Sequence, residues 1–316
     1  MASEKQTPRA LQPGDTIGLV APAGVVDRER LNRAVGILQD CGFRTKTYRD
    51  LFARDGFLAG NDQIRVAELH AAFADPEVAA VFPARGGYGC LRLLPHLDLQ
   101  LIRNHPKLFV GFSDNTVLHA AFARHADLVT FHGPHPSDSL GRPDGPTPLT
   151  AEWYWRFLQG EADAYPLHLP LPDAVALREG EAQGKIVGGN LALIGALMGT
   201  AFEPEFDGNL LLIEDIGEPA YRVDRLLTQL LVAGKLQRVA GVLVGDFLWD
   251  GATPEPHGVT IRHVLEERLG QLSCPVLLGI KSGHGEDNLT LPFGSSVLLD
   301  ASAGSLTFLE RPTQSP

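Results

Sequence analysis

Short apolar runs that alternate with helical stretches constrain the fold of this chain most. Three apolar runs of strand length occur in the first 135 residues, at 15–21, 78–83 and 107–112. Between and after them lie stretches with apolar residues at the spacing of a helix face, at 27–41, 61–73 and 116–125. Strands that alternate with helices predict a parallel sheet covered on both faces. The expected fold class is therefore α/β.

The second half of the chain has the same elements in a less regular order. Its expected strands lie at 185–187, 209–213, 239–245 and 276–280, and a closing hairpin is expected at 295–299 and 305–309. Residues 136–184 are rich in Pro, Gly and Asp apart from one aromatic helix at 151–158, a composition typical of a crossover between domains. We expect an N-terminal α/β domain at 1–150, an interdomain linker at 151–183 and a smaller, strand-rich C-terminal domain at 184–316.

Charge and cysteine content exclude several classes of protein. The net charge is -11, and a nucleic-acid binder needs a basic face. No run approaches the roughly 20 apolar residues that cross a bilayer, and residues 1–15 lack the apolar core of a secretory signal. The cysteines, Cys41, Cys90 and Cys274, are odd in number and far apart. We therefore expect a cytoplasmic protein with no nucleic-acid or membrane partner and no disulfide framework.

Ser113 follows an apolar strand and directly precedes a helix. Residues 110–116 read VGFSDNT, with a glycine two positions before the serine. This arrangement is typical of a nucleophile elbow, in which a sharp turn raises the serine hydroxyl beside free N–H groups of a new helix. Asn115 stands where G-x-S-x-G has its second glycine. The alternative is that Ser113 is an ordinary helix N-cap.

A glycine-rich loop follows another expected strand. Residues 84–89 read ARGGYG, and the pair Gly86-Gly87 lets the backbone approach a ligand closely. The loop matches neither the dinucleotide nor the Walker A pattern. It could supply an oxyanion donor, and we expect Arg85 to bind a substrate carboxylate. A phosphate loop or a plain tight turn is the alternative.

A serine nucleophile needs a base, and the base needs an orienting acid. His284 lies between two glycines after the expected strand 276–280, and Glu214 follows the apolar strand NLLLI. Each could also be a plain surface or core residue. A second cluster contains two histidines and an acid, His132, His135 and Asp138. These residues could be metal ligands, but the segment lacks the H-E-x-x-H pattern.

In this order the motifs resemble the LD-carboxypeptidase family of serine peptidases, which includes the microcin C self-immunity peptidases. The resemblance spans about residues 11–310. Its motifs are PGD at 13–15, VAPAG at 20–24, ARGGYG at 84–89, GFSDN at 111–115, GGNL at 188–191, LIEDIGEPAY at 212–221 and GH at 283–284.

The resemblance implies a Ser–Glu–His triad of Ser113, Glu214 and His284, with Glu218 as a less favoured acid. It implies oxyanion donors on the backbone of Asp114 and of the Gly86-Gly87 pair. It also implies a catalytic site where the two domains meet, a homodimer, and no cofactor or metal. The expected reaction is hydrolysis of the amide bond between the L-centre of meso-diaminopimelate and a terminal D-alanine in murein tetrapeptides, a step of cell-wall recycling.

Two other functions remain open at this point. Within the family, the chain could be a self-immunity peptidase that cleaves a toxic peptidyl-nucleotide. Outside it, the chain could be a non-catalytic two-domain protein that uses the ARGGYG loop to bind an anion. A serine-directed label would separate these classes, because a binding protein would not react with it.

Overall fold

The computed structural model describes residues 5–160, 165–249 and 258–314. The chain forms two compact units. The first comprises Met1–Ala162, Asn288–Phe293 and Pro312–Pro316, and the second comprises Asp163–Asp287 and Gly294–Arg311. The aromatic helix at 151–158 belongs to the first unit. No helix in the described part of the chain is long and apolar enough to cross a membrane.

The first unit is built on a six-stranded sheet in the order β12-β5-β4-β3-β1-β2. All neighbouring strands pair in parallel except β12, which pairs antiparallel with β5. The strands are β1 (Thr16–Val20), β2 (Arg44–Thr47), β3 (Val78–Pro83), β4 (Leu108–Gly111), β5 (Thr130–His132) and β12 (Leu291–Phe293). The α/β class predicted from the alternating pattern is confirmed.

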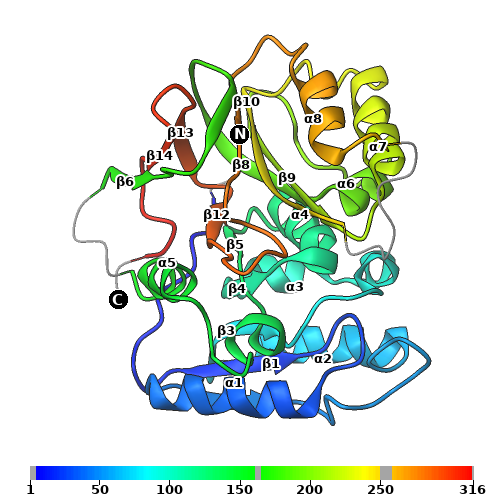
Figure 1. The fold of residues 1–316 in the computed structure, drawn as a ribbon. Helices are drawn as coiled ribbons and strands as arrows, with labels where there is room; N and C mark the ends of the chain where they lie inside the picture. Colours follow the sequence, from blue (N-terminus) through cyan, green and yellow to red (C-terminus); the bar gives the residue numbers. More distant parts are fainter. Residues whose placement is uncertain (1–4, 161–164, 250–257, 315–316) are drawn as a thin grey trace. The chain divides into compact units, whose positions relative to one another are not determined.

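Helices cover both faces of this sheet (Figure 1). α2 (Asp62–Ala74), α3 (Leu99–Asn104) and α4 (Thr116–His125) pack against one another, whereas α1 (Arg28–Asp40) packs against a π-helical turn at Pro136–Leu140. α5 (Pro148–Leu158) completes the set. The predicted caps are present, since the Asp27 and Asn61 side chains accept hydrogen bonds from the first turns of α1 and α2.

The strand order reverses beside β1, because β2 lies on one side of it and β3 on the other. The loops after β1 and β3 therefore diverge at the carboxyl ends of the strands, where open parallel sheets bind their ligands. The Gly24 N–H, after β1, donates to the Gly86 carbonyl, after β3, over 3.1 Å. The predicted glycine loop therefore lies at the switch point of the sheet.

The second unit has an eight-stranded sheet in the order β6-β14-β13-β8-β9-β10-β11-β7. Its centre, β8 to β11, is parallel, and the outer strands pair antiparallel. The strands are β6 (Leu167–Pro170), β7 (Val175–Arg178), β8 (Glu181–Asn190), β9 (Leu210–Ile216), β10 (Gly241–Leu248), β11 (Val276–Leu278), β13 (Ser296–Asp300) and β14 (Ser305–Phe308). α6 (Leu191–Leu197), α7 (Ala220–Val232) and α8 (Ile261–Leu269) are its helices.

Two local expectations differ from this structure. Residues 165–184 are not a featureless crossover, because they form β6, β7 and the start of β8. β6 and β7 are the two edge strands of the sheet, and edge positions tolerate the prolines that pointed to a loop. β9 also continues past residue 213 to Ile216, so Glu214 lies within the strand rather than after it.

Candidate active site

Ser113 occupies a strained backbone turn between β4 and α4. Its φ is +58°, in the left-handed region that residues with a side chain seldom adopt. Phe112 before it is extended, and a 3₁₀ turn over Ser113–Asn115 leads directly into α4. Strain of this kind persists at functional sites, and this is the geometry of a nucleophile elbow.

Two glycines leave the space that this turn requires. A Cβ at Gly111 would lie 3.2 Å from the Asn115 side chain, and a Cβ at Gly86 would lie 3.2 Å from Ser113 Oγ. Asn115 takes the position of the second glycine of the G-x-S-x-G pattern. Its amide packs over Gly111 and contacts His135 Nε2 at 2.7 Å. Asn115 therefore fits in place of the second glycine because Gly111 has no side chain to collide with it.

His135 is a histidine close to Ser113 within the first unit, and it has a carboxylate partner. A Cβ at Gly86 would lie 3.1 Å from His135 Cε1 as well as close to Ser113. His135 Nδ1 faces Asp138 Oδ2 at 3.2 Å, while its Nε2 accepts the Phe112 N–H over 3.2 Å. Because Nε2 is already an acceptor for the backbone, His135 holds the elbow in place rather than serving as its base.

The metal interpretation of His132, His135 and Asp138 finds little support in this geometry. In the described ranges, no three His, Cys, Asp or Glu side chains come together as potential metal ligands. The His132 ring instead stacks on Phe293 with ring centroids 5.3 Å apart. Both histidines are fully buried, so their contacts are those of a packed core.

Arg85 and Asp138 flank the glycine pair. Arg85 Nη1 donates to the Val25 carbonyl over 3.0 Å. Burial acts to raise the pKa of Asp138. That pKa is nevertheless held below its usual value by the interaction with His135, by the charge of Arg85 and by a hydrogen bond from the Gly86 N–H. Gly86 therefore directs its N–H toward a carboxylate.

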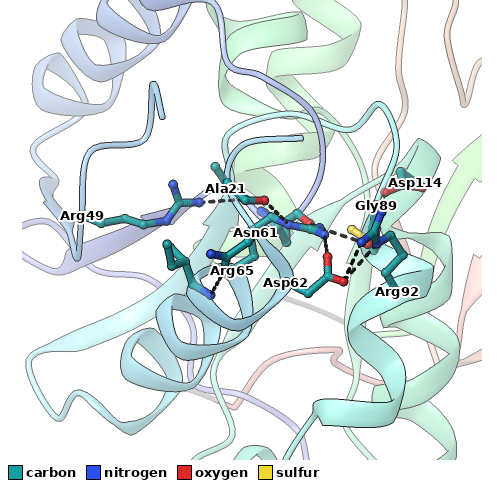
Figure 2. A network of polar contacts seen from close by, with 12 residues as sticks. Ala21, Arg49, Asn61, Asp62, Arg65, Gly89, Arg92 and Asp114 are labelled. Carbon is teal, nitrogen blue, oxygen red and sulfur yellow. Dashed lines mark hydrogen bonds and ion pairs between the residues drawn. The ribbon is translucent and has the colours of Figure 1, made fainter. Parts of the chain in front are cut away.

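A network of polar contacts centred on Arg65 connects these loops (Figure 2). Arg65 is fully buried. Its Nη1 donates to the carbonyls of Pro22 and Gly89, and its Nη2 binds Asp62 Oδ1 at 2.5 Å. It therefore joins the loop after β1 to the end of the glycine loop. Nothing in the local sequence marks Arg65, because its role depends on carbonyls far away in the chain.

Asp114 connects the glycine loop to the elbow. Its Oδ2 accepts the Cys90 N–H over 2.7 Å, and burial raises its pKa despite that hydrogen bond and the nearby charge of Arg65. The side chain is thus engaged in the interior.

Glu214 and His284 lie together in the second unit. His284 Nδ1 lies 2.7 Å from Glu214 Oε2, and Glu214 is fully buried. A carboxylate oxygen only accepts, so Nδ1 carries a proton, and in the neutral imidazole Nε2 therefore keeps its lone pair. Glu214 Oε1 has no hydrogen-bond partner among the described residues.

Glu218, the less favoured acid, does not contact His284 in this way. It forms an ion pair of 3.3 Å with Arg222, one turn further along the chain. The structure therefore brings His284 together with Glu214. The first unit contains the other predicted site residues, namely Ser113, Gly86, Gly87, Asp114 and Arg85.

Two family models match this chain, one in its N-terminal half and one in its C-terminal half. The LD-carboxypeptidase N-terminal domain matches residues 17–133, and the LD-carboxypeptidase C-terminal domain matches residues 183–299. The chain belongs to the LD-carboxypeptidase family. It is a serine-type carboxypeptidase, and therefore a hydrolase.

Three relatives show how wide the likeness is within the LD-carboxypeptidases. The probable murein peptide carboxypeptidase of Bacillus subtilis is 40% identical over 93% of this chain and 91% of its own. The muramoyltetrapeptide carboxypeptidase of Oxalobacter formigenes has a known structure with a TM-score of 0.81 and 31% identity, covering 94% of this chain and 100% of its own. The microcin C7 self-immunity protein MccF of Escherichia coli is 28% identical over 95% of each chain.

The sequence did not reveal Asp246, a further acid of this LD-carboxypeptidase. Its Oδ2 accepts the N–H of Gly285, the residue after His284, over 3.1 Å. Burial and the nearby Glu214 raise the pKa of Asp246 to about 6, although the Gly285 N–H, Lys281 and His284 oppose the shift. The strand GVLVGDF contains an acid near its end, just as NLLLIED does, and that parallel was the available signal.

Proposed function

We propose that this LD-carboxypeptidase removes the terminal D-alanine from murein tetrapeptides. The bond cleaved is the amide between the L-centre of meso-diaminopimelate and D-alanine. The Glu214–His284 hydrogen bond of 2.7 Å is the observation that carries the proposal. It supports a role for His284 as the base, because it holds the proton on Nδ1 and leaves Nε2 of the neutral ring as an acceptor. The named activities of the B. subtilis and O. formigenes relatives support the choice of substrate.

In the proposed mechanism Ser113, His284 and Glu214 act as a catalytic triad. His284 Nε2 accepts the proton from Ser113 Oγ as that oxygen attacks the substrate carbonyl. The tetrahedral intermediate collapses, the C–N bond breaks, and the proton passes from Nε2 to the departing amine of D-alanine. Water, deprotonated by His284, then hydrolyses the acyl-enzyme. Glu214 keeps Nδ1 protonated and stabilises the imidazolium that forms at each step.

The negative charge on the tetrahedral oxygen needs N–H donors in fixed positions. We assign this role to the backbone of Asp114 and of the Gly86-Gly87 pair. Since the Gly86 N–H lies against Asp138, Gly87 is the donor that we expect from the pair. Arg85, beside it, is proposed to bind the free carboxylate of the substrate.

We propose that the enzyme acts in the cytoplasm, as a homodimer and without a cofactor or a nucleic-acid partner. The family resemblance supports the dimer and the absence of a cofactor. The odd, scattered cysteines and the charge of -11 support the location and argue against nucleic acid. In this proposal the first unit carries the nucleophile, and the second unit carries the acid and the base.

A second candidate is a self-immunity peptidase that cleaves a peptidyl-nucleotide, and the likeness to MccF favours it. The two functions share the chemistry at the scissile amide and differ in the leaving group. Purified enzyme should be incubated separately with a murein tetrapeptide and with an aminoacyl sulfamoyl adenosine, and the products weighed by mass spectrometry. Loss of one alanine from the tetrapeptide supports the proposal. Cleavage of the nucleotide conjugate alone would replace it with the second candidate.

A further inference from the structure

A β-bulge lies beside Glu214 in the second unit. β10 pairs with β9 from Gly241 to Val244, and the register then shifts so that Phe247 pairs with Asp215. Two residues of β10, Gly245 and Asp246, thus stand opposite Glu214 alone. Bulges turn a side chain out of the regular alternation and are common next to active sites.

The bulge directs Asp246 toward the loop that carries His284. The Asp246 N–H donates to the Ser282 carbonyl over 3.0 Å, and Asp246 Oδ2 accepts the Gly285 N–H over 3.1 Å. A Cβ at Gly245 would lie 2.3 Å from the Ser282 oxygen, so only glycine permits this approach. One residue therefore binds the backbone on both sides of His284.

Glu214 holds the same loop at its centre. His284 Nδ1 lies 2.7 Å from Glu214 Oε2, and a Cβ at Gly283 would lie 2.9 Å from that oxygen. The φ of Gly283 is +129°, which glycine alone adopts readily. The ring is thus oriented by Glu214, whereas the backbone on which it stands is fixed from β10.

We propose that Asp246 is a positioning residue for the reaction, which fixes the backbone of residues 282–285 and thereby the place of the His284 imidazole. The inference rests on the proposed function of His284 as the base. In this role Asp246 acts through the backbone of the loop. Its carboxylate fixes the position of the base that the proposed mechanism requires, and a displacement of about 1 Å at such a group can cost on the order of 10²-fold in rate.

Two substitutions at Asp246 distinguish its role as a hydrogen-bond acceptor from the effect of its negative charge. Asp246→Ala removes both, whereas Asp246→Asn keeps an oxygen that can accept the Gly285 N–H. We expect kcat on a murein tetrapeptide to fall on the order of 10²-fold in Asp246→Ala with KM changed by less than about twofold, and Asp246→Asn to recover most of kcat. Glu266→Gln, which removes an exposed acid from α8 of the same unit, should behave as the wild type.

The negative charge of Asp246 can be tested separately through the pH dependence of kcat/KM. Glu214 of β9 and Lys281 and His284 of the loop are the ionisable groups that act on Asp246. Loss of its negative charge leaves the His284 imidazolium less stabilised, so the acid limb of kcat/KM should move to lower pH in Asp246→Asn. A role confined to folding would leave this limb in place.

Hydrogen–deuterium exchange tests the inference without any substrate. The backbone amides of residues 281–287 should exchange at least about tenfold faster in Asp246→Ala than in the wild type, with Asp246→Asn between them and Glu266→Gln unchanged. Unchanged exchange in Asp246→Ala, or faster exchange with an unchanged kcat, would overturn the positioning role. A wild-type enzyme that releases no D-alanine would instead overturn the proposed function. In that case the exchange rates would still show whether Asp246 fixes the backbone of the loop.

Discussion

His284 donates the proton of its Nδ1 to Oε2 of Glu214 over 2.7 Å, and Glu214 is fully buried within β9. The direction of this hydrogen bond selects the Nδ1-protonated form of the neutral imidazole, because a carboxylate has no proton to give. It leaves Nε2 as the acceptor that a serine nucleophile requires. His135, which lies near Ser113 in the first unit, has its Nε2 occupied by the Phe112 N–H, so it does not offer a free acceptor in the way that Nε2 of the neutral His284 ring does.

Glu214→Gln should lower kcat on the order of 10⁴-fold. The amide that replaces the carboxylate can donate to Nδ1, and this favours the tautomer whose Nε2 is protonated and cannot act as a base. Initial rates on a murein tetrapeptide measure the effect. Glu218→Gln is the matched control and should retain activity, since Glu218 pairs with Arg222. Inactivation by Glu218→Gln with a functional Glu214→Gln would reverse the assignment.

Gly86→Ala should reduce kcat on the order of 10²-fold while the protein stays folded. Its methyl group would lie 3.0 Å from Ser113 Cβ and 3.2 Å from Ser113 Oγ, and therefore displaces the hydroxyl. Gly36→Ala in α1, where a Cβ meets nothing within 4 Å, is the control. That control should raise stability by about 0.5–1 kcal/mol and leave kcat unchanged. Wild-type activity in Gly86→Ala would show that the loop does not crowd the nucleophile.

His119, beneath the elbow, should make the first unit sensitive to acid. Its ring bonds the Gly111 carbonyl at 2.7 Å and Thr130 Oγ1 at 2.8 Å. Burial, and to a smaller extent the charge of His135, lowers its pKa to about 4 even though the Gly111 carbonyl opposes the shift. An unfolded histidine titrates near pH 6.5. Between these values the unfolded state binds the proton, so stability falls as pH drops from about 6.5 toward 4.

The loss attributable to His119 should be on the order of 3 kcal/mol. Asp215 and Asp246, whose pKa values burial raises to about 6, change stability in the opposite direction over this range. His119→Gln isolates the histidine, because both acids remain in the variant. Between pH 7 and pH 4.5 the free energy of urea unfolding should fall by less, or rise by more, in His119→Gln than in the wild type, with a gap of about 2–3 kcal/mol between the two proteins. An equal difference would mean that His119 does not titrate as described.

Arg85→Ala should raise KM for a peptide with a free C-terminus about tenfold with little change in kcat. The guanidinium lies beside the glycine pair and is proposed to bind the substrate carboxylate. The same tetrapeptide with an amidated C-terminus is the control, because it has no carboxylate to bind. An unchanged KM for the free acid would assign Arg85 only to its contacts with Val25 and Asp138.

Sequence reasoning succeeded where local rules decide the structure. The strand–serine–helix pattern around Ser113 was predictable because the apolar run, the glycine at 111 and the first turn of α4 are adjacent in the chain. Helix caps at Asp27 and Asn61 were predictable for the same reason. The likeness of ordered motifs to one family then gave Glu214 and His284.

Sequence reasoning failed where distant segments decide the structure. The burial of Arg65 depends on the carbonyls of Pro22 and Gly89, and the orientation of Asp246 depends on a register shift between β9 and β10. β6 and β7 went unrecognised because edge strands of four residues carry little apolar pattern. Each of these features requires the pairing of strands or loops that are far apart in sequence.

The most direct test of the account is release of D-alanine from a murein tetrapeptide by the wild type and by Ser113→Ala, followed by mass spectrometry. We predict that the wild type removes one D-alanine and that Ser113→Ala is slower on the order of 10⁴-fold or more. Equal release by both proteins would contradict the assignment of Ser113 as the nucleophile. Release by neither would contradict the proposed substrate.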